Sequence, residues 1–202
     1  MKKETDVREF LENLLNDLRT IGYIKPQDIP NINLYMDQVT TFMEEQLEVC
    51  KRHESDKILT KTMINNYSKN NLLPPPEKKK YSKEHVIMLL FIYYFKSMLS
   101  INDIQSILNP LKENYFGNEN GPNMLDIYEE IFQLEREESK KVLKDLGKKY
   151  RTAQNTFSDF PKEHQKYLHA FSFICMLSYD VYFKKMLIEQ IIDDFENENA
   201  DA

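Results

Sequence analysis

Glycine is scarce in this chain, and the scarcity limits the folds open to it. Only 4 of the 202 residues are glycine, whereas β-rich folds use glycine in many of their turns. Apolar residues recur instead at spacings of three and four, the period of an amphipathic helix. With 41% hydrophobic and 30% charged residues, the composition is that of a folded chain. We therefore predict an all-α protein whose helices are joined by short connections.

Capping residues and prolines set the predicted helix boundaries. Thr60 is a suitable N-cap, Ser100 and Asp103 form a capping-box pair, and the prolines at 74–76 end any helix before them. A polar loop over 112–122, with two of the glycines, is the best domain boundary. The predicted helices cover 5–21, 34–52, 60–70, 83–98, 100–111, 123–151 and 162–195. The predicted divisions are an N-terminal helix and linker (1–33), a central unit (34–111), a C-terminal helical and oligomerisation module (123–195) and an acidic tail (196–202).

Charge is distributed unevenly along the chain. The formal net charge is −6, which disfavours a protein that coats nucleic acid over its whole surface. Residues 51–83, however, carry nine basic and three acidic residues, so that this segment is +6 and the remainder −12. A local basic patch of this kind is typical of a DNA-facing surface on an acidic protein, and equally of a solvated charged face.

The segment 59–69 has two chemically different sides when it is drawn as a helix. Leu59, Met63, Ile64 and Tyr67 fall on one side and can dock on a neighbouring helix. Amides, hydroxyls and ammonium groups fall on the other. Asparagine can pair with adenine in the major groove, and lysine with guanine or phosphate. The pattern favours the second helix of a helix-turn-helix.

Several residues in the segment 59–108 occur in an order and at spacings that resemble those of the MerR family. In that family the second helix ends in an aromatic pair, a glycine and Leu-Leu-Pro, and the following helices open with Tyr-Ser and Ser-hydrophobic-x-Glu-Ile. Asn71 takes the place of the glycine, and asparagine is the other residue that readily adopts a left-handed C-cap. The matching residues are Tyr67, Asn71, Leu72, Leu73, Pro74, Tyr81, Ser82, Leu90, Ile92, Lys96, Ser100, Ile101, Asp103 and Ile104.

Segments 34–42 and 59–67 are closer still to an uncharacterised bacterial family, known only as a domain of unknown function (number eighteen thirty-six). The resemblance implies a MerR-like helix-turn-helix unit and supplies no measured activity. The resemblance to the MerR family implies a sequence-specific transcriptional regulator of bacterial type, with double-stranded DNA as the partner. In MerR proteins a long helix after the DNA-binding unit builds the dimer, so the helix at 123–151 is expected to form a homodimer.

The chain departs from the MerR pattern in several places, and these departures support an alternative. Asn65 replaces the usual arginine, Asn66 replaces the first aromatic, and the wing at 77–80 is too short for the family's β-hairpin. The helix at 34–50 also differs from the usual first helix. The alternative is a helical protein–protein interaction module that keeps the fold but has lost DNA binding.

The predicted DNA contacts lie on the polar helix face and in the basic segment that follows. If six of the lysines contact DNA, the logarithm of the binding constant should fall with the logarithm of salt concentration with a slope of about −5 per protomer. The predicted DNA-binding residues are Lys61, Thr62, Asn65, Asn66, Ser68, Lys69, Lys78, Lys79, Lys80 and Lys83.

Other functional classes find little support. The chain has no nucleophile elbow, phosphate-binding glycine loop or paired-carboxylate signature, so we expect no enzyme and no cofactor. The four histidines lack metal-ligand spacing, and two distant cysteines predict neither a metal sensor nor a disulfide. The longest apolar run, 86–95, is too short for a bilayer, and no secretory signal opens the chain. A cytoplasmic protein without membrane contact is expected.

The last two predicted helices are rich in aromatic residues. Such a set could line a pocket for a small-molecule effector, but a core or a subunit interface is the commoner arrangement, and a core is favoured here. Asp180 is the one acidic residue in the run and could bind an effector, pair across an interface or lie exposed. The aromatic residues are Phe157, Phe160, Tyr167, Phe171, Phe173, Tyr179, Tyr182 and Phe183.

Overall fold

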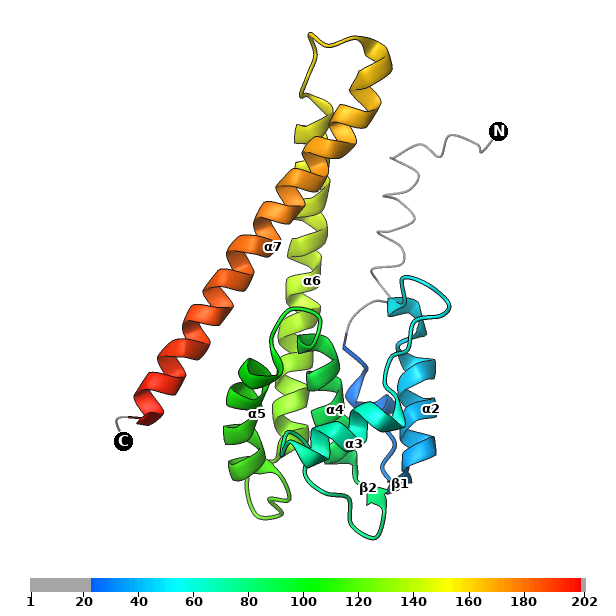
Figure 1. The fold of residues 1–202 in the computed structure, drawn as a ribbon, viewed down its shortest axis with the longest axis vertical. Helices are drawn as coiled ribbons and strands as arrows, with labels where there is room; N and C mark the ends of the chain where they lie inside the picture. Colours follow the sequence, from blue (N-terminus) through cyan, green and yellow to red (C-terminus); the bar gives the residue numbers. More distant parts are fainter. Residues whose placement is uncertain (1–22, 201–202) are drawn as a thin grey trace.

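The computed structural model describes residues 23–200 and shows a mostly helical protein, which confirms the all-α prediction (Figure 1). The helix predicted over 5–21 lies outside the described residues. The helices are α2 (Met36–Gln46), α3 (Lys61–Lys69), α4 (Lys83–Phe95), α5 (Ile101–Tyr115), α6 (Met124–Gln154) and α7 (Lys162–Ala200). Two short 3-10 helices, η1 (Pro26–Asp28) and η2 (Glu48–Cys50), and two strands, β1 (Leu34–Tyr35) and β2 (Lys80–Tyr81), complete the described elements.

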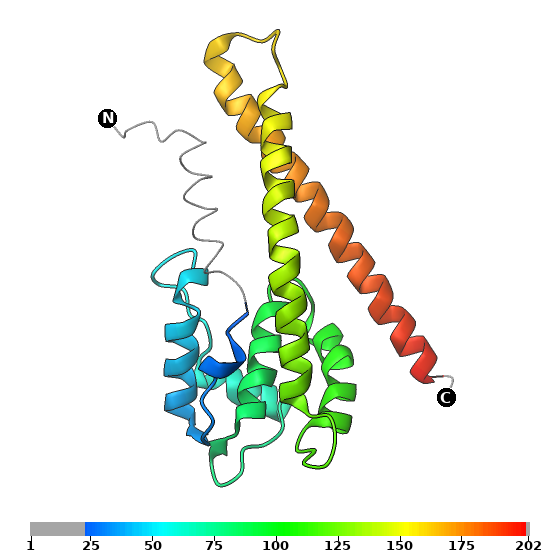
Figure 2. The same cartoon turned by 180° about the vertical axis from the view of Figure 1, so that it is seen from behind.

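The core is built around α4. Every residue of α4 from His85 to Ile92 is buried, so neighbours must cover this helix on all sides. α5, α6 and β2 pack against it, and the same apolar cluster takes in Val39 and Met43 of α2 and Ile64 of α3. The elements α2 to α5 therefore gather at one end of the molecule, with the first half of α6 beside them (Figures 1 and 2).

Several helix starts follow the predicted caps. The Thr60 hydroxyl accepts a hydrogen bond from the Met63 amide at 3.2 Å, and the Ser100 hydroxyl accepts one from the Asp103 amide at 3.1 Å. The Asp103 carboxylate accepts from the Ser100 amide in return, which completes the capping box. These boundaries depend on local chemistry, and for that reason the sequence predicts them well.

Two of the helices differ from the prediction in where they begin or end. The helix predicted over 34–52 is interrupted at both ends, because Leu34 and Tyr35 pair antiparallel with Tyr81 and Lys80, and the chain tightens into η2 after Gln46. α5 continues past Pro110 to Tyr115, so the polar loop starts later than predicted. A proline inside a helix removes one backbone donor, here the bond to the Ser106 carbonyl, and the helix tolerates this loss.

α6 and α7 form a long antiparallel hairpin that extends away from the core end (Figure 2). Near its tip, Lys149 bonds to both Asp145 and Asp180, and the rings of Tyr150 and Phe173 meet edge to face. Asp180 thus pairs within the hairpin. α7 then diverges from α6 and reaches α5 near its end, where Ser106 bonds to Glu196. It continues as helix to Ala200, through most of the tail predicted over 196–202.

The aromatic residues near the hairpin do not form a core. Six of the eight are exposed and two are partly buried, so the favoured core assignment is wrong. The reason is that α6 is the one described helix that packs against the aromatic part of α7, and a single neighbouring helix can bury only one side of it. Over the described residues, no helix is long and apolar enough to cross a membrane.

Candidate nucleic-acid interface

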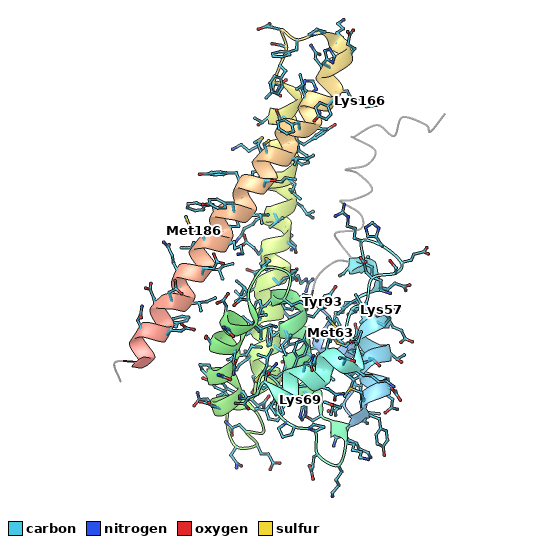
Figure 3. The ribbon with its side chains drawn as sticks, in the orientation of Figure 1. Lys57, Met63, Lys69, Tyr93, Lys166 and Met186 are labelled. Atoms are coloured by element: carbon cyan, nitrogen blue, oxygen red, sulfur yellow. The ribbon has the colours of Figure 1, made fainter. Side chains whose placement is uncertain are left out.

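α3 has the two-sided character that its sequence predicts. Ile64 and Tyr67 are buried, and Met63 packs against the same core (Figure 3). The opposite side faces solvent. Of the predicted contact residues on α3, Lys61, Thr62, Asn65, Asn66 and Lys69 are exposed, and Ser68 is half-buried.

The end of α3 confirms the predicted left-handed C-cap. Asn71 has φ +57°, a conformation that glycine and asparagine tolerate best. The amide of Leu72 then donates to the Tyr67 carbonyl at 2.9 Å, and Lys112 of α5 donates to the Asn71 carbonyl at 2.8 Å. α5 therefore holds the C-terminal end of α3 in place.

The segment that leads into α3 is held by α4. The ammonium group of Lys96 donates to the Ile58 carbonyl at 2.6 Å and lies 4.6 Å from the centroid of the Tyr93 ring. Burial lowers the pKa of Lys96. Lys96 was expected only as part of the family pattern, and sequence reasoning missed its positioning role because its partner is a backbone carbonyl 38 residues away.

Residues 77–80 form a tight turn, which we call the lysine turn. The amide of Lys80 donates to the Glu77 carbonyl at 2.9 Å, and the same two residues form a β-bridge. Lys78 and Lys79 have φ +49° and +65°. Two successive positive φ angles are the mark of a type I′ turn, which normally uses Asn-Gly. The segment closes as a minimal turn.

His85 connects the lysine turn to the core. Its Nδ1 accepts a hydrogen bond from the Ser82 amide at 3.0 Å, and its Nε2 lies 3.4 Å from the Pro75 carbonyl. Burial lowers the pKa of this imidazole, which keeps it in the neutral form that can accept the Ser82 bond. The segment between Pro75 and Ser82 is therefore fixed at both ends.

The start of α2 brings α3 and the lysine turn together. Asp37 forms an ion pair with Lys61, and the ammonium group of Lys80 lies 5.1 Å from the centroid of the Tyr35 ring. Tyr35 is the N-cap of α2, so both lysines lie beside the same helix end. Lys78 projects into solvent with 89% of its side chain exposed.

Lys83 is separated from this group. It is half-buried at the start of α4 and lines a surface hollow with Asp126, Glu129 and Glu130 of α6. The other predicted lysines have few acidic neighbours. Among the described residues, Lys61 forms an ion pair with Asp37 and Lys78 with Glu77, and neither of these acids belongs to α6 or α7.

The described part of the chain brings no three His, Cys, Asp or Glu side chains close enough together to hold a metal ion. The half-buried thiol of Cys50 has its pKa raised by burial, which disfavours the reactive thiolate. What the fold does concentrate on one surface is a short polar helix and a lysine-rich turn.

These features define a class: an all-α protein whose short two-sided helix and lysine turn are fixed to a common core. Comparison with protein families gives a match over residues 24–131 to the family described as Domain of unknown function (DUF1836). The match covers more than half of the chain, and this protein belongs to that family. It spans η1 to the first turns of α6. Neither the comparison with curated proteins nor that with solved structures finds a match.

Proposed function

We propose that this protein is a sequence-specific DNA-binding transcriptional regulator whose residues 34–111 act as a MerR-like helix-turn-helix. The observation that carries the proposal is the exposed polar side of α3, which lies with the lysine turn beside the start of α2 and is fixed to the same core. A helix of nine residues whose buried side docks on the core can enter a major groove with its polar side.

The residues divide by the part of DNA that they would contact. Asn65, at the middle of the exposed side of α3, reads base edges, and a bidentate amide contact to adenine is worth about 1–3 kcal/mol of discrimination. Lys78 and Lys79 contact phosphates beside the groove, where they contribute affinity without sequence preference. Lys96 and Lys112 fix both ends of α3, which keeps Asn65 in a constant register on the duplex.

A helical interaction module remains the second candidate, and one observation favours it. Lys61 is already paired with Asp37, so a phosphate would have to compete with a carboxylate at the start of α3. A protein partner with an acidic and polar surface could use the same lysines. The two candidates differ in whether base sequence matters.

The test is selection from a pool of random duplex DNA, followed by mobility-shift titration at low and moderate salt. We expect an enriched site, loss of selectivity for Asn65→Ala of roughly tenfold or more, and weaker binding to all sequences for the triple variant Lys78→Ala, Lys79→Ala, Lys80→Ala. The matched control is Lys140→Ala, Lys144→Ala, Lys148→Ala, which removes three exposed lysines from α6 and should leave binding unchanged.

The salt dependence gives an independent measure of the phosphate contacts. Five predicted lysines remain beside α3 and the turn when Lys83 is set aside, so the slope should be about −4 to −5 and should become shallower by about 3 in the turn variant. Binding that appears only at low salt, without an enriched site and with equal losses in both triple variants, would refute the proposal. Capture of protein partners would then test the interaction module.

A further inference from the structure

The outer side of α7 carries a regularly spaced row of residues that are all apolar except Ser178. Tyr167, Phe171, Ile174, Ser178 and Val181 follow one another at spacings of four, three, four and three, which keeps them on one side of the helix. We call this row, with the adjacent Tyr182, the α7 stripe. All six residues are exposed.

The stripe lies on the side of α7 opposite to α6. The residues that contact α6 or its connecting loop, Ser172, Phe173 and Asp180, lie on the other side of the helix. Figure 3 shows Met186, one turn beyond Tyr182, projecting from α7 on the side away from α6. The row is therefore not part of the hairpin's own packing.

From these observations we propose that the α7 stripe is the interface between two copies of this chain, which pair α7 against α7 as a coiled coil. The alternating spacing of three and four is the pattern of a coiled-coil seam, in which each side chain inserts between residues of a facing helix. A helix that lies on a membrane surface can share this spacing, but its polar side is rich in lysine and arginine, and residues 167–183 contain neither.

The size of the stripe agrees with such an interface. The exposed fractions of its five apolar residues run from 48% for Phe171 to 70% for Tyr167. With ~200 Å² for each aromatic side chain, the stripe offers on the order of 600 Å², at the upper end of the largest patches on monomers. Specific interfaces bury ~800 Å² per partner, and the adjoining Tyr179 and Met186 are also exposed.

The charge pattern fits a symmetric partner. Between Tyr167 and Phe183 the only Asp, Glu, Lys or Arg is Asp180, and it is paired with Lys149 on the α6 side. Two stripes can therefore face each other without bringing like charges together. The exposed side of α6, by contrast, carries Glu137, Glu138, Lys140 and Lys141, so we place the interface on α7 and not on α6.

A parallel arrangement of the two α7 helices follows if the protein also binds DNA, and this step rests on the proposed function. α3 and the lysine turn lie at the same end of the molecule as the C-terminal end of α7 (Figure 1). Parallel packing keeps the two copies of α3 at one end, where a single duplex can reach both. Antiparallel packing would send them to opposite ends.

The first experiment measures the mass of the full chain by sedimentation, without DNA, across a concentration series. We expect a dimer whose dissociation constant rises at least about tenfold in Ile174→Glu, because a charge would be buried at the seam. The matched control is Ile32→Glu, an equally exposed isoleucine (66% against 57%) outside the stripe. Circular dichroism checks that both variants remain folded.

Two sedimentation results and one flotation result would overturn the interface. One is a monomeric chain at tens of micromolar, where an interface of standard size should be populated. The other is a dimer that Ile174→Glu leaves intact. Flotation with anionic phospholipid vesicles that Ile174→Glu abolishes would likewise overturn it, in favour of a membrane surface.

The second experiment tests orientation through cross-linking. In a background with Cys50→Ser and Cys175→Ser, which removes both native thiols, Tyr167→Cys and Tyr182→Cys are prepared separately and oxidised. If the two α7 helices are parallel, each variant should cross-link with a second copy of itself. If they are antiparallel about Ile174, only a mixture of the Tyr167→Cys and Tyr182→Cys variants should cross-link. Antiparallel cross-linking would refute the parallel arrangement. It would not contradict the α7 interface or DNA binding, which sedimentation and DNA selection test separately.

Discussion

α4 and the segment 167–183 of α7 are both apolar nearly all round, yet α4 is buried and this part of α7 is largely exposed. Residues 86–92 of α4 are all buried, whereas Tyr167, Ile174, Tyr179 and Val181 of α7 are more than half exposed. α4 is central to the family region (residues 24–131), where α5, α6 and β2 pack against it. α7 has one neighbour along most of its length. An apolar helix thus indicates that its side chains need to be buried. Whether other elements of the same chain or a partner molecule bury them depends on the rest of the fold.

The largest effect should come from one substitution made in both helices. Ile87→Ala in α4 removes a fully buried side chain and should cost about 2–5 kcal/mol in the free energy of unfolding. Ile174→Ala in α7 should cost less than ~0.5 kcal/mol at low protein concentration. Urea unfolding at several concentrations measures both. A large, concentration-independent cost at Ile174 would break the comparison, because it would mean that α7 is covered by its own chain.

A substitution with a smaller expected effect can locate the boundary between the family region and the rest of the α6–α7 hairpin. The Tyr128 hydroxyl of α6 donates to the Ile24 carbonyl at 2.7 Å in a buried site. Tyr128→Phe leaves that carbonyl without its donor and should cost about 1–2 kcal/mol. Tyr182→Phe, on the exposed side of α7, is the matched control and should have no measurable effect. Equal stabilities for the two variants would mean that the first turns of α6 do not belong to the family region's cooperative unit.

The helix boundaries show how far local sequence determines this fold. Thr60, Ser100 and Asn71 act on groups within a few residues, and the predicted caps at these positions are confirmed. The interruption of the helix predicted over 34–52 depends on pairing with Lys80 and Tyr81, which are more than 40 residues away. No local pattern contains that information.

The candidate site also has features that the local sequence predicts and features that it does not. The polar side of α3 follows from the helical period of its own residues, and it is exposed as expected. The backbone conformation of Lys78 and Lys79 could not be inferred, because two lysines are unusual in a turn with two positive φ angles. Nor could the sequence separate Lys83 from the other lysines, since the acids beside it belong to α6.

Asn71 tests whether the end of α3 depends on local backbone preference or on packing. Asn71→Ala should cost about 1 kcal/mol, because alanine is disfavoured at φ +57°. Asn71→Gly should be within a few tenths of wild type, because glycine accepts this conformation. Thermal unfolding measures both. If the two variants are equally destabilised, the side chain of Asn71 is required, and the C-cap account of this end of α3 is wrong.

The smallest effect should be a gain in stability within the family region, at the surface that we assign to DNA. Lys78→Asn with Lys79→Gly installs the residues that a type I′ turn prefers and should stabilise the fold by about 0.5–1 kcal/mol. Lys78→Ala with Lys79→Ala removes the same charges and leaves the backbone in an unfavourable conformation, so it should bring no gain. Both variants should bind DNA equally weakly, with a salt slope that is shallower by about 2.

A gain in stability together with weaker DNA binding would mean that the two lysines lower the stability of the turn. That cost is expected where a surface binds a polyanion. A stability gain without loss of DNA binding would instead remove the lysine turn from the interface and leave α3 alone to account for it.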